Sequence, residues 1–566
     1  MKTLYRTTTV GLALLLMVSL AGCVDLAVEN NNSPNRDQVL ASPEDVVNLV
    51  GGSFLDFWRA NMWSDGQMPI TTMADEYTFS WANFSGRALA EEPRKAFDNS
   101  SAYRYQAANS NPWNRNYLAI SNASDALAII AQDEQTFRDQ GIDVDRLKAF
   151  AKFVQGLSHG YIALRYDQGF TVDETIDLAN TTLELQPYQA VMDFALQKLD
   201  EAIAISFNTT ITAEEDWIFG LNVTDEDLDR LANSFAARFI ASLARDPAER
   251  AAANWGAVMQ RIGAGIVEDW APIGDDSGDF EWDPTKSWGQ EGRTWSRADY
   301  KTIGPADESG GYQGWLNTPV ADRAIFDIFT ADRRIVGPED GSETIVADEQ
   351  RDRAGAHAEG TVLTYPQNSG TDFEYWGVNG PFPSSRGTYH YSSHTHKRYR
   401  SYLDAGNNGP MVQMKVLEMD MLMAEALLRT GGSTETVAGL INKTRVARGE
   451  LAEATAGTPV GTPDHGPNDA TYAPTQAGAT LWDMLKWEKN IDGYVAGSGR
   501  AWFDKRGWGD LITGTLIHFP VPGAELEVLQ LQNYTFGGVG GPGSAPKRVL
   551  TREDRERSKA NTARVK

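Results

Sequence analysis

Aromatic side chains in segments without helical spacing offer the clearest chemistry in this sequence. The chain holds 16 tryptophans, and many of them fall among Gly, Asp, Ser and Asn. An exposed indole face stacks on the apolar face of a sugar ring, while Asn, Arg and Asp side chains bond the sugar hydroxyls. We expect ligand contacts from Trp81, Asn83, Arg87, Trp282, Trp288, Trp295, Tyr312, Trp315, Tyr375 and Trp376. The pattern predicts an aromatic-lined site built from residues 71–104, 270–315 and 372–376.

Two other roles for these aromatic residues stay open at this point. A loop tryptophan can anchor its loop by packing into the protein interior. It can also pack against a partner protein, since aromatic residues are enriched in interfaces. Binding measurements on alanine variants would separate the three roles.

Catalytic motifs are scarce. The sequence has no G-x-S-x-G, no H-E-x-x-H and no Walker A loop. Residues 538–543 fit G-x-G-x-x-G, but they lack the preceding strand and following helix of a dinucleotide site. Asp75 and Glu76 form one of many acidic pairs, and we interpret the pair as surface charge because carboxylate separation is a three-dimensional property. We therefore expect no catalytic residues and no enzyme.

Histidines and acids suggest two metal sites, neither of which we assign. His390, His394 and His396 could supply three imidazoles to zinc. The basic residues at 397, 398 and 400 would oppose a cation, so we expect a solvated basic loop there. No cofactor is expected from this cluster.

A calcium loop is the second possibility. Asp275, Ser277, Asp279 and Glu281 alternate like calcium ligands, but Phe280 stands where an EF-hand needs glycine. A looser structural calcium site remains open, because oxygen ligands bind this cation in many arrangements.

The first 23 residues have the parts of a lipoprotein signal peptide. Lys2 and Arg6 precede an apolar run over residues 10–20, which is too short to span a membrane. The run ends in Leu-Ala-Gly before Cys23, which resembles a bacterial lipobox whose cysteine is lipidated. Cys23 is the only cysteine among 566 residues, so it forms no internal disulfide. We predict a signal peptide over 1–22, a lipidated tether over 23–41 and a single domain over 42–566.

The charge balance excludes whole classes of partner. The chain has 77 Asp and Glu against 51 Lys and Arg, a net charge of −26. Nucleic-acid binding needs basic patches that neutralise phosphate, and we expect none. Adhesion to anionic lipid headgroups is excluded for the same reason, so membrane contact should come from the lipid anchor only.

Apolar residues at helical spacing predict the scaffold that positions these groups. Ser42 and Pro43 open a first helix as N-cap and first helical residue. Three helix pairs follow, over 143–166 with 187–207, 227–244 with 247–266, and 411–429 with 433–448. Such pairs resemble tetratricopeptide units, although their spacing is uneven. The prediction is a mainly α fold, a tetratricopeptide-like helix-pair scaffold with long irregular loop insertions at about 270–410.

Three stretches, in order along the chain, resemble the RagB/SusD family of outer-membrane nutrient-binding lipoproteins. The first is 23–58, with its lipidated cysteine, Asn/Pro tether and helix start. The second is VLEMDMLMAEA at 416–426 with INKTR at 441–445, similar to the family's "LaE…L.AEA…iN.vR". The third is GRAWFDKRGW at 499–508 with IHFPVP at 517–522 and Glu525, similar to "G.RwfDL.RWg…fPiP..E".

This resemblance implies a SusD-like α-helical fold with four helix-turn-helix repeats. It also implies an outer-membrane, lipid-anchored protein facing the cell exterior. Such a protein captures an oligosaccharide or another nutrient oligomer and delivers it to a TonB-dependent outer-membrane transporter. The shared charged residues are expected to serve folding, with Arg500 and Asp504, four residues apart, either pairing with each other or capping neighbouring backbone. Two alternatives remain, a surface glycosidase or peptidase with dispersed carboxylates and a purely structural transporter partner.

Overall fold

The computed structural model describes residues 42–79, 81–178, 180–275, 282–288, 296–342, 345–346, 360–378, 390–466 and 468–540. The chain divides into two compact units, residues 1–48 and residues 49–566. The predicted signal peptide, Cys23 and the tether lie outside the described residues, as does Trp295. Those assignments stay predictions, and the account below concerns the second unit.

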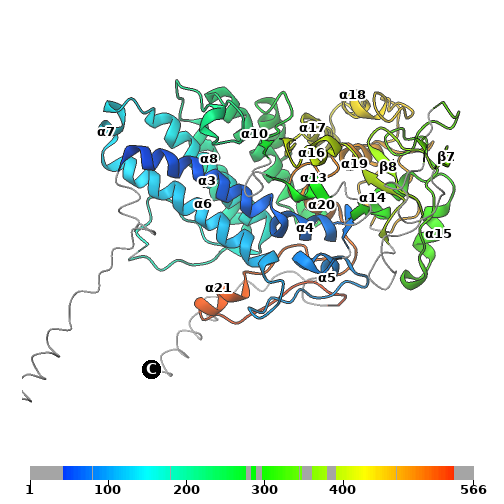
Figure 1. Cartoon of the computed structure of the whole chain (residues 1–566), viewed down its shortest axis with the longest axis horizontal. Helices are drawn as coiled ribbons and strands as arrows, with labels where there is room; N and C mark the ends of the chain where they lie inside the picture. Colours follow the sequence, from blue (N-terminus) through cyan, green and yellow to red (C-terminus); the bar gives the residue numbers. More distant parts are fainter. Residues whose placement is uncertain are drawn as a thin grey trace, which may run out of the picture. The chain divides into compact units, whose positions relative to one another are not determined.

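The second unit is mainly α-helical (Figure 1). Helix α3 (Pro43–Asn61) starts in the first unit and continues into the second. The helices before residue 270 are α4 (Ser64–Met73), α5 (Gly86–Ala90), α6 (Ala107–Gln132), α7 (Glu134–Asp139), α8 (Val144–Arg165), α9 (Tyr188–Ile203), α10 (Asp225–Ser242), α11 (Pro247–Ala251) and α12 (Trp255–Gly263). Those after it are α13 (Pro284–Trp288), α14 (Tyr300–Ile303), α15 (Gly311–Asn317), α16 (Arg400–Asp404), α17 (Val416–Thr430), α18 (Thr434–Arg445), α19 (Leu481–Ile491), α20 (Arg500–Trp508) and α21 (Gly523–Val528).

The predicted helix pairs are present, and side-chain caps set their ends. The Asp143 carboxylate accepts bonds from the first backbone N–H groups of α8, and Thr224 forms a capping box at the start of α10. The segment predicted as one helix over 247–266 is instead α11 and α12. The chain breaks there because Asn254 caps a new helix by accepting a bond from the Ala257 N–H.

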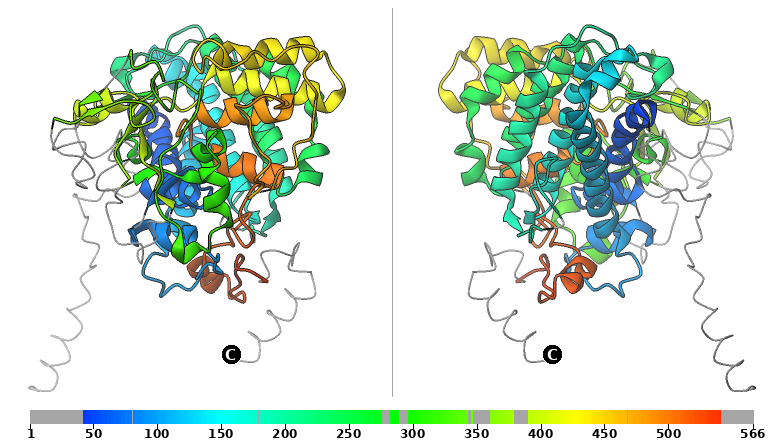
Figure 2. Two further views of the ribbon diagram at one scale, coloured as in Figure 1. Left: turned by 90° about the vertical axis from the view of Figure 1, so that its right-hand side faces the viewer. Right: turned by 90° about the vertical axis from the view of Figure 1, so that its left-hand side faces the viewer.

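Close helix crossings organise the scaffold. Helix α8 packs against α6 and α9, α10 against α9 and α12, and α17 against α12, α18 and α19. A Cβ at Gly160 of α8 would lie 2.1 Å from the Phe239 ring, so only glycine permits this approach of α8 and α10. Figure 2 shows the cyan-to-green helices side by side, with the yellow and orange helices of α17–α20 next to them. The mainly α helix-pair architecture is therefore confirmed.

Short antiparallel strand pairs lie in the loop-rich part of the unit. β1 (Tyr77–Phe79) pairs with β5 (Ser296–Ala298), with Tyr77 opposite Ala298. β8 (Phe373–Tyr375) pairs with β9 (His394–His396), with Phe373 opposite His396. The remaining described pairs are β2 (Gln168–Gly169) with β3 (Gln186–Pro187), β4 (Ile273–Gly274) with β10 (Gly409–Pro410), and β6 (Ile345–Val346) with β7 (Val362–Leu363).

The strands bring the three predicted site regions together. β5 packs against β9, and a bridge between Asp299 and Tyr391 continues this contact. The described parts of the three regions 71–104, 270–315 and 372–376 are therefore joined through β1, β5, β9 and β8. As for the membrane, no helix within the described part of the chain has both the length and the apolar character to cross one.

Candidate functional site

A network of buried ion pairs holds helices of the scaffold together. Arg250 donates two hydrogen bonds to Glu425, at 2.9 and 2.7 Å, and one to Asp504 at 3.1 Å. Lys489 bonds the same Asp504 oxygen at 2.8 Å. Of the two roles open for Arg500 and Asp504, the structure shows the pair, at 3.5 Å. Because these side chains are buried and saturate one another, the shared motif charges serve folding.

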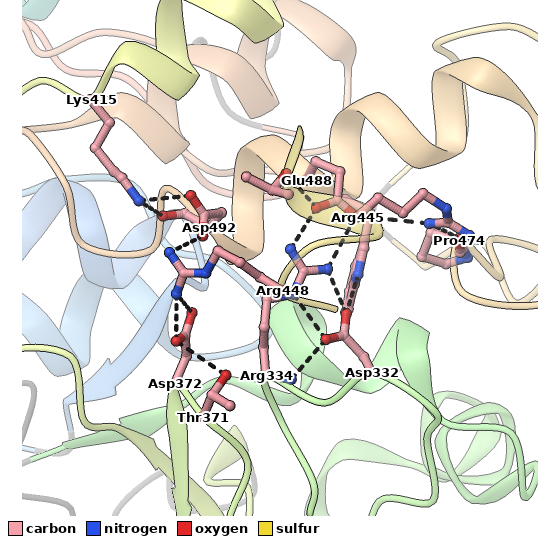
Figure 3. Close-up of polar contacts among 12 residues, drawn as sticks. Asp332, Arg334, Thr371, Asp372, Lys415, Arg445, Arg448, Pro474, Glu488 and Asp492 are labelled. Carbon is pink, nitrogen blue, oxygen red and sulfur yellow. Dashed lines mark hydrogen bonds and ion pairs between the residues drawn. The ribbon is translucent and has the colours of Figure 1, made fainter. Parts of the chain in front are cut away.

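A second charged cluster fixes the loops to the scaffold (Figure 3). We call it the polar junction, and its members are Asp332, Arg334, Asp372, Arg448, Glu488 and Asp492. At its centre, Arg334 donates to Asp332 at 2.9 and 2.7 Å and to Glu488 of α19 at 2.5 Å. All three side chains have zero exposure, so the loop at 332–334 is tied to α19 by fully buried charges.

The other half of the polar junction anchors the strand that carries Tyr375 and Trp376. Arg448 donates to both Asp372 oxygens at 2.6 Å and lies 2.7 Å from Asp492. Burial alone would raise the pKa of Asp372, but Arg398 and Arg448 hold this pKa below its ordinary value. The start of β8 is therefore held by ionised groups at neutral pH.

The candidate ligand surface is a cluster of half-buried aromatic rings. We call it the aromatic platform and define it as Phe84, Trp282 and Trp288. Phe84 stacks on Trp288 with ring centroids 5.9 Å apart and planes at 27°, and Trp282 meets Trp288 edge-on at 5.1 Å. Each ring is only partly covered by protein. Aromatic faces that are fixed by one another and still reach the surface suit stacking on a ligand ring.

The backbone under Phe84 has an uncommon conformation. Phe84 and the next residue, Ser85, both have left-handed dihedrals, with φ of 55° and 62°. Non-glycine residues in this region cost on the order of 1 kcal/mol or more each, and such strain clusters at binding sites. Ser85 Oγ lies 2.7 Å from the Tyr103 hydroxyl, which helps hold the turn. The turn thereby presents the Phe84 ring to Trp288.

Buried polar contacts fix the tryptophan side of the platform. Asp283, with zero exposure, accepts hydrogen bonds from Lys286 at 2.5 Å and from Gln413 at 2.6 Å. Burial would raise the pKa of Asp283, but Lys286 and these hydrogen bonds lower it. Trp58 Nε1 donates to the Trp282 carbonyl at 3.3 Å. Helix α13, which ends at Trp288, is thus pinned on its inner side.

Three further predicted residues lie close in sequence to the platform. Trp81 and Arg87 are half-buried, and Asn83 is exposed. The Arg87 N–H donates to the Trp81 carbonyl at 3.2 Å, which closes the turn that carries Phe84. The ligand contacts of these three residues stay a prediction.

The remaining predicted residues are placed differently, in the interior. Tyr312 and Trp315 are 3 % and 4 % exposed and stack on each other at 6.0 Å, while Arg323 covers Trp315 at 4.1 Å. Tyr375 is 1 % exposed and donates to Asp327 at 2.9 Å. We therefore correct their assignment from ligand contact to loop anchoring, because protein atoms already cover their rings.

Trp376 is also largely buried. It is 8 % exposed, and its Nε1 donates to Glu374 at 3.2 Å. Its carbonyl accepts a bond from Arg297 at 3.3 Å, which joins it to β5. Trp376 consequently belongs with the anchoring residues.

The histidine cluster is not a solvated loop, and that expectation is wrong. His390 is 3 % exposed, and His394 and His396, which form the ends of the buried strand β9, have zero exposure. His396 stacks on Tyr494 at 4.8 Å. Burial lowers the pKa of His394 to about 3, so this ring is neutral.

One grouping within the described residues has the spacing of a metal site, namely Asp75, Asp299 and His390. Arg94 donates two 2.7 Å hydrogen bonds to Asp75, and Lys301 lies 3.4 Å from the His390 ring. Burial and the nearby Asp75 raise the pKa of Asp299 to about 7. Asp75 is already paired with Arg94, and the raised pKa leaves the Asp299 carboxyl partly protonated near neutral pH, so we assign no metal to this cluster.

The pair Asp75 and Glu76 is also buried, so its interpretation as surface charge is wrong. Glu76 is 6 % exposed and pairs with Arg500 at 3.2 Å. The predicted calcium loop cannot be followed, since Ser277, Asp279 and Glu281 lie outside the described residues. The calcium site therefore stays a prediction.

Sequence reasoning missed two features of the site. Phe84 carries no signal, because nothing in the sequence marks a phenylalanine with positive φ. The polar junction had a partial signal in the basic residue Arg448, just after α18. Its partner Asp372 lies 76 residues earlier in the sequence, so spacing alone could not find the pair.

Comparisons with known proteins identify the fold. No family model matches the chain, and no curated protein matches it. A SusD homolog from Parabacteroides distasonis is similar in structure at 12 % identity, with 86 % of this chain and 93 % of that chain covered and a TM-score of 0.55. A SusD superfamily protein from Bacteroides vulgatus matches at 13 % identity over 85 % and 96 % of the two chains, with a TM-score of 0.49. The chain has the SusD-like fold, as its motifs led us to expect.

Proposed function

We propose that this protein is a non-enzymatic capture protein that binds a nutrient oligomer, most simply a glycan, through the aromatic platform. One observation carries the proposal: Phe84, Trp282 and Trp288 form a cluster of rings that contact one another, and each residue is only half-buried. Rigid aromatic faces bind sugar rings without needing a reactive group. The SusD-like fold supports this role at the level of analogy.

The finer parts of the proposal come from the sequence. We propose that lipid on Cys23 anchors the protein to the outer membrane, facing outward, and that it delivers ligand to a TonB-dependent transporter. The acidic net charge of −26 favours an acyl anchor over attraction to anionic lipid. Lipid analysis of the purified membrane form tests the anchor, and co-purification with a barrel transporter tests the partner.

The binding experiment uses the soluble chain from Val24 onward on a glycan and peptide array, with tryptophan fluorescence on each hit. We expect binding with a fluorescence change and no released product. Trp288→Ala and Trp282→Ala should weaken binding, whereas Phe329→Ala is the matched control. Phe329 is an exposed aromatic residue, at 37 %, outside the platform. Equal binding by all three variants would remove the platform from the proposal.

The two alternatives give different results in the same experiment. Hydrolysed oligosaccharide or peptide would identify a surface hydrolase with dispersed carboxylates. No binding to any array member, together with co-purification of a transporter, would identify a purely structural partner.

A further inference from the structure

The pair of strands β1 and β5 is in contact with the aromatic platform at one end. There, Phe79 lies opposite Ser296. The Phe79 ring has its centroid 6.4 Å from that of Phe84, and Ser296 Oγ donates to the Trp288 carbonyl at 2.8 Å. Two of the three platform residues are therefore tied to this end of the strand pair.

Two buried acids lie at the other end of the strand pair. Asp75 stands one residue before Glu76 and β1, and Asp299 directly follows β5. The Asp299 N–H donates to the Glu76 carbonyl at 3.3 Å, which continues the strand pairing. One oxygen of each carboxyl and one nitrogen of His390 all lie within 4.8 Å of one another. We call Asp75 and Asp299 the carboxyl pair, and they are 3 % and 2 % exposed.

The two members of the carboxyl pair are neutralised unequally. Asp75 accepts two 2.7 Å hydrogen bonds from Arg94. Asp299 accepts one from the backbone N–H of Lys301 at 2.8 Å, and its other oxygen lies 3.4 Å from His390 Nδ1. Burial lowers the pKa of His390 well below its ordinary value, so this imidazole is neutral. Among the described residues, Asp299 forms no ion pair with a lysine or arginine side chain.

The cations around the carboxyl pair are bound to other groups. Lys301 of α14 pairs with Glu92, and Arg323 lies 3.6 Å from the same carboxylate. Lys505 of α20 donates to the Ala74 carbonyl at 2.6 Å. These cations lower the charge repulsion in the cluster without bonding the Asp299 carboxyl.

The other titratable groups that face the pair add no cation. Glu76 is paired with Arg500, and Tyr312, Tyr391 and Tyr494 approach from α15, the start of β9 and the loop after α19. Burial raises the pKa of Tyr312 and of Tyr494, so both hydroxyls are neutral. Burial and the charge of Asp75 leave the pKa of Asp299 raised to about 7.

We infer that the carboxyl pair is a proton-sensitive latch that holds the strand pair under the aromatic platform closed. With a proton on Asp299, the pair carries one negative charge. When that proton passes to solvent, two like charges lie within 4.8 Å in the interior, and their repulsion loosens the pairing of β1 with β5. The consequence for a ligand rests on the proposed function, because it acts through Phe84 and Trp288.

Hydrogen–deuterium exchange of peptides that cover β1 and β5 tests the latch in the soluble chain from Val24 onward. The closed strand pair keeps a proton that an opened one, with Asp299 in solvent and an ordinary pKa of about 3.9, releases. We therefore expect protection, corrected for the intrinsic exchange rate, to fall about tenfold from pH 5 to 6 and to level off above pH 7.

Two variants isolate the proton. Asp299→Asn keeps an oxygen for the Lys301 N–H but cannot ionise, so its protection should lack this fall. Asp229→Asn is the matched control, since the pKa of Asp229 on α10 is also raised, to about 6, by burial and Asp225. It should keep the fall. The same pH dependence in Asp299→Asn and the unchanged protein would overturn the inference.

Affinity for a neutral glycan found on the array tests the link to the platform. The unchanged protein should bind about threefold more weakly at pH 8 than at pH 5.5, as for a closed fraction of about one third, and Asp299→Asn should bind equally at both. Equal affinity of the unchanged protein at both pH values would overturn this link. If no glycan binds at either pH, the proposed function fails, and the exchange experiment still decides on the latch.

Discussion

The polar junction and the aromatic platform lie in the same loop-rich part of the unit, yet they are built in opposite ways. In the polar junction, Arg334 and its two carboxylate partners have zero exposure and use their hydrogen-bonding atoms on one another. In the aromatic platform, each ring has a fixed inner side and an incompletely covered outer side. Saturated charges hold loops in place, whereas half-buried aromatic residues suit contact with a ligand. Substitutions should therefore affect stability in the first region and affinity in the second.

The largest effect is expected at the centre of the polar junction. Arg334→Met should destabilise the protein by about 3–5 kcal/mol, because it leaves the buried Asp332 and Glu488 carboxylates without their cation. Urea unfolding followed by circular dichroism measures the change. A loss below about 1 kcal/mol would mean that the junction contributes little to folding.

The second-largest effect is expected on the free energy of unfolding when the pH is lowered, through the buried histidines of β9. The pKa of His394 is lowered to about 3 by burial, against about 6.5 in an unfolded chain. The unfolded state therefore binds a proton that the folded state does not, and stability is lost as the pH falls from about 6.5 toward 3.

The size of this effect is about 1.4 kcal/mol per pH unit for one histidine, or about 2 kcal/mol between pH 6.5 and 5. His394→Gln should reduce the fall in unfolding free energy over that interval by this amount. If the unfolding free energies of the unchanged protein and His394→Gln fall equally with pH, His394 does not gain a proton on unfolding.

A smaller effect, on affinity and not on stability, is expected at the platform. Trp288→Ala should weaken glycan binding by about 1–2 kcal/mol, as for a central aromatic contact. Its unfolding free energy should change less than that of Arg334→Met, since the ring is only half-buried. Titration of one array hit, with Phe329→Ala in parallel, checks both statements. A Trp288→Ala variant that loses stability but keeps full glycan affinity would contradict the expected role of the platform.

The smallest effect is expected for a surface ion pair. Lys443, whose side chain is 54 % exposed, pairs with Asp420 at 2.7 Å. Lys443→Met should change the unfolding free energy by less than about 1 kcal/mol, because solvent screens exposed pairs. If Lys443→Met lowered the unfolding free energy as much as Arg334→Met, the exposure of an ion pair would not predict its contribution to stability.

Much of the scaffold could be predicted from local patterns. Apolar spacing and caps located α8, α9, α10, α17 and α18 to within a few residues or less at most ends. The 26-residue helix α6 was not predicted. Its Pro112 and many Asn and Ser residues hide the helical pattern, and packing against α8 and α4 compensates for the weak propensity.

The sequence predicted the regions that form the candidate site. The structure then showed which predicted residues in these regions are buried and which are half-buried or exposed. Trp315 has the same residue type and a similar polar sequence context as Trp282 and Trp288, so sequence could not tell buried anchors from half-buried rings. The burial of Trp315 and Tyr375 depends on partners such as Arg323 and Asp327, whose proximity is created by the fold.

The sequence by itself determined the helix-pair scaffold, the acidic surface, the absence of familiar catalytic motifs and the regions that form the site. These follow from residue type and short-range spacing, which act within one or two helical turns. Tertiary structure alone decided which aromatic rings remain exposed and which histidines and carboxylates are buried and paired. Those outcomes depend on contacts between residues far apart in the chain, and burial and pKa arise from such contacts.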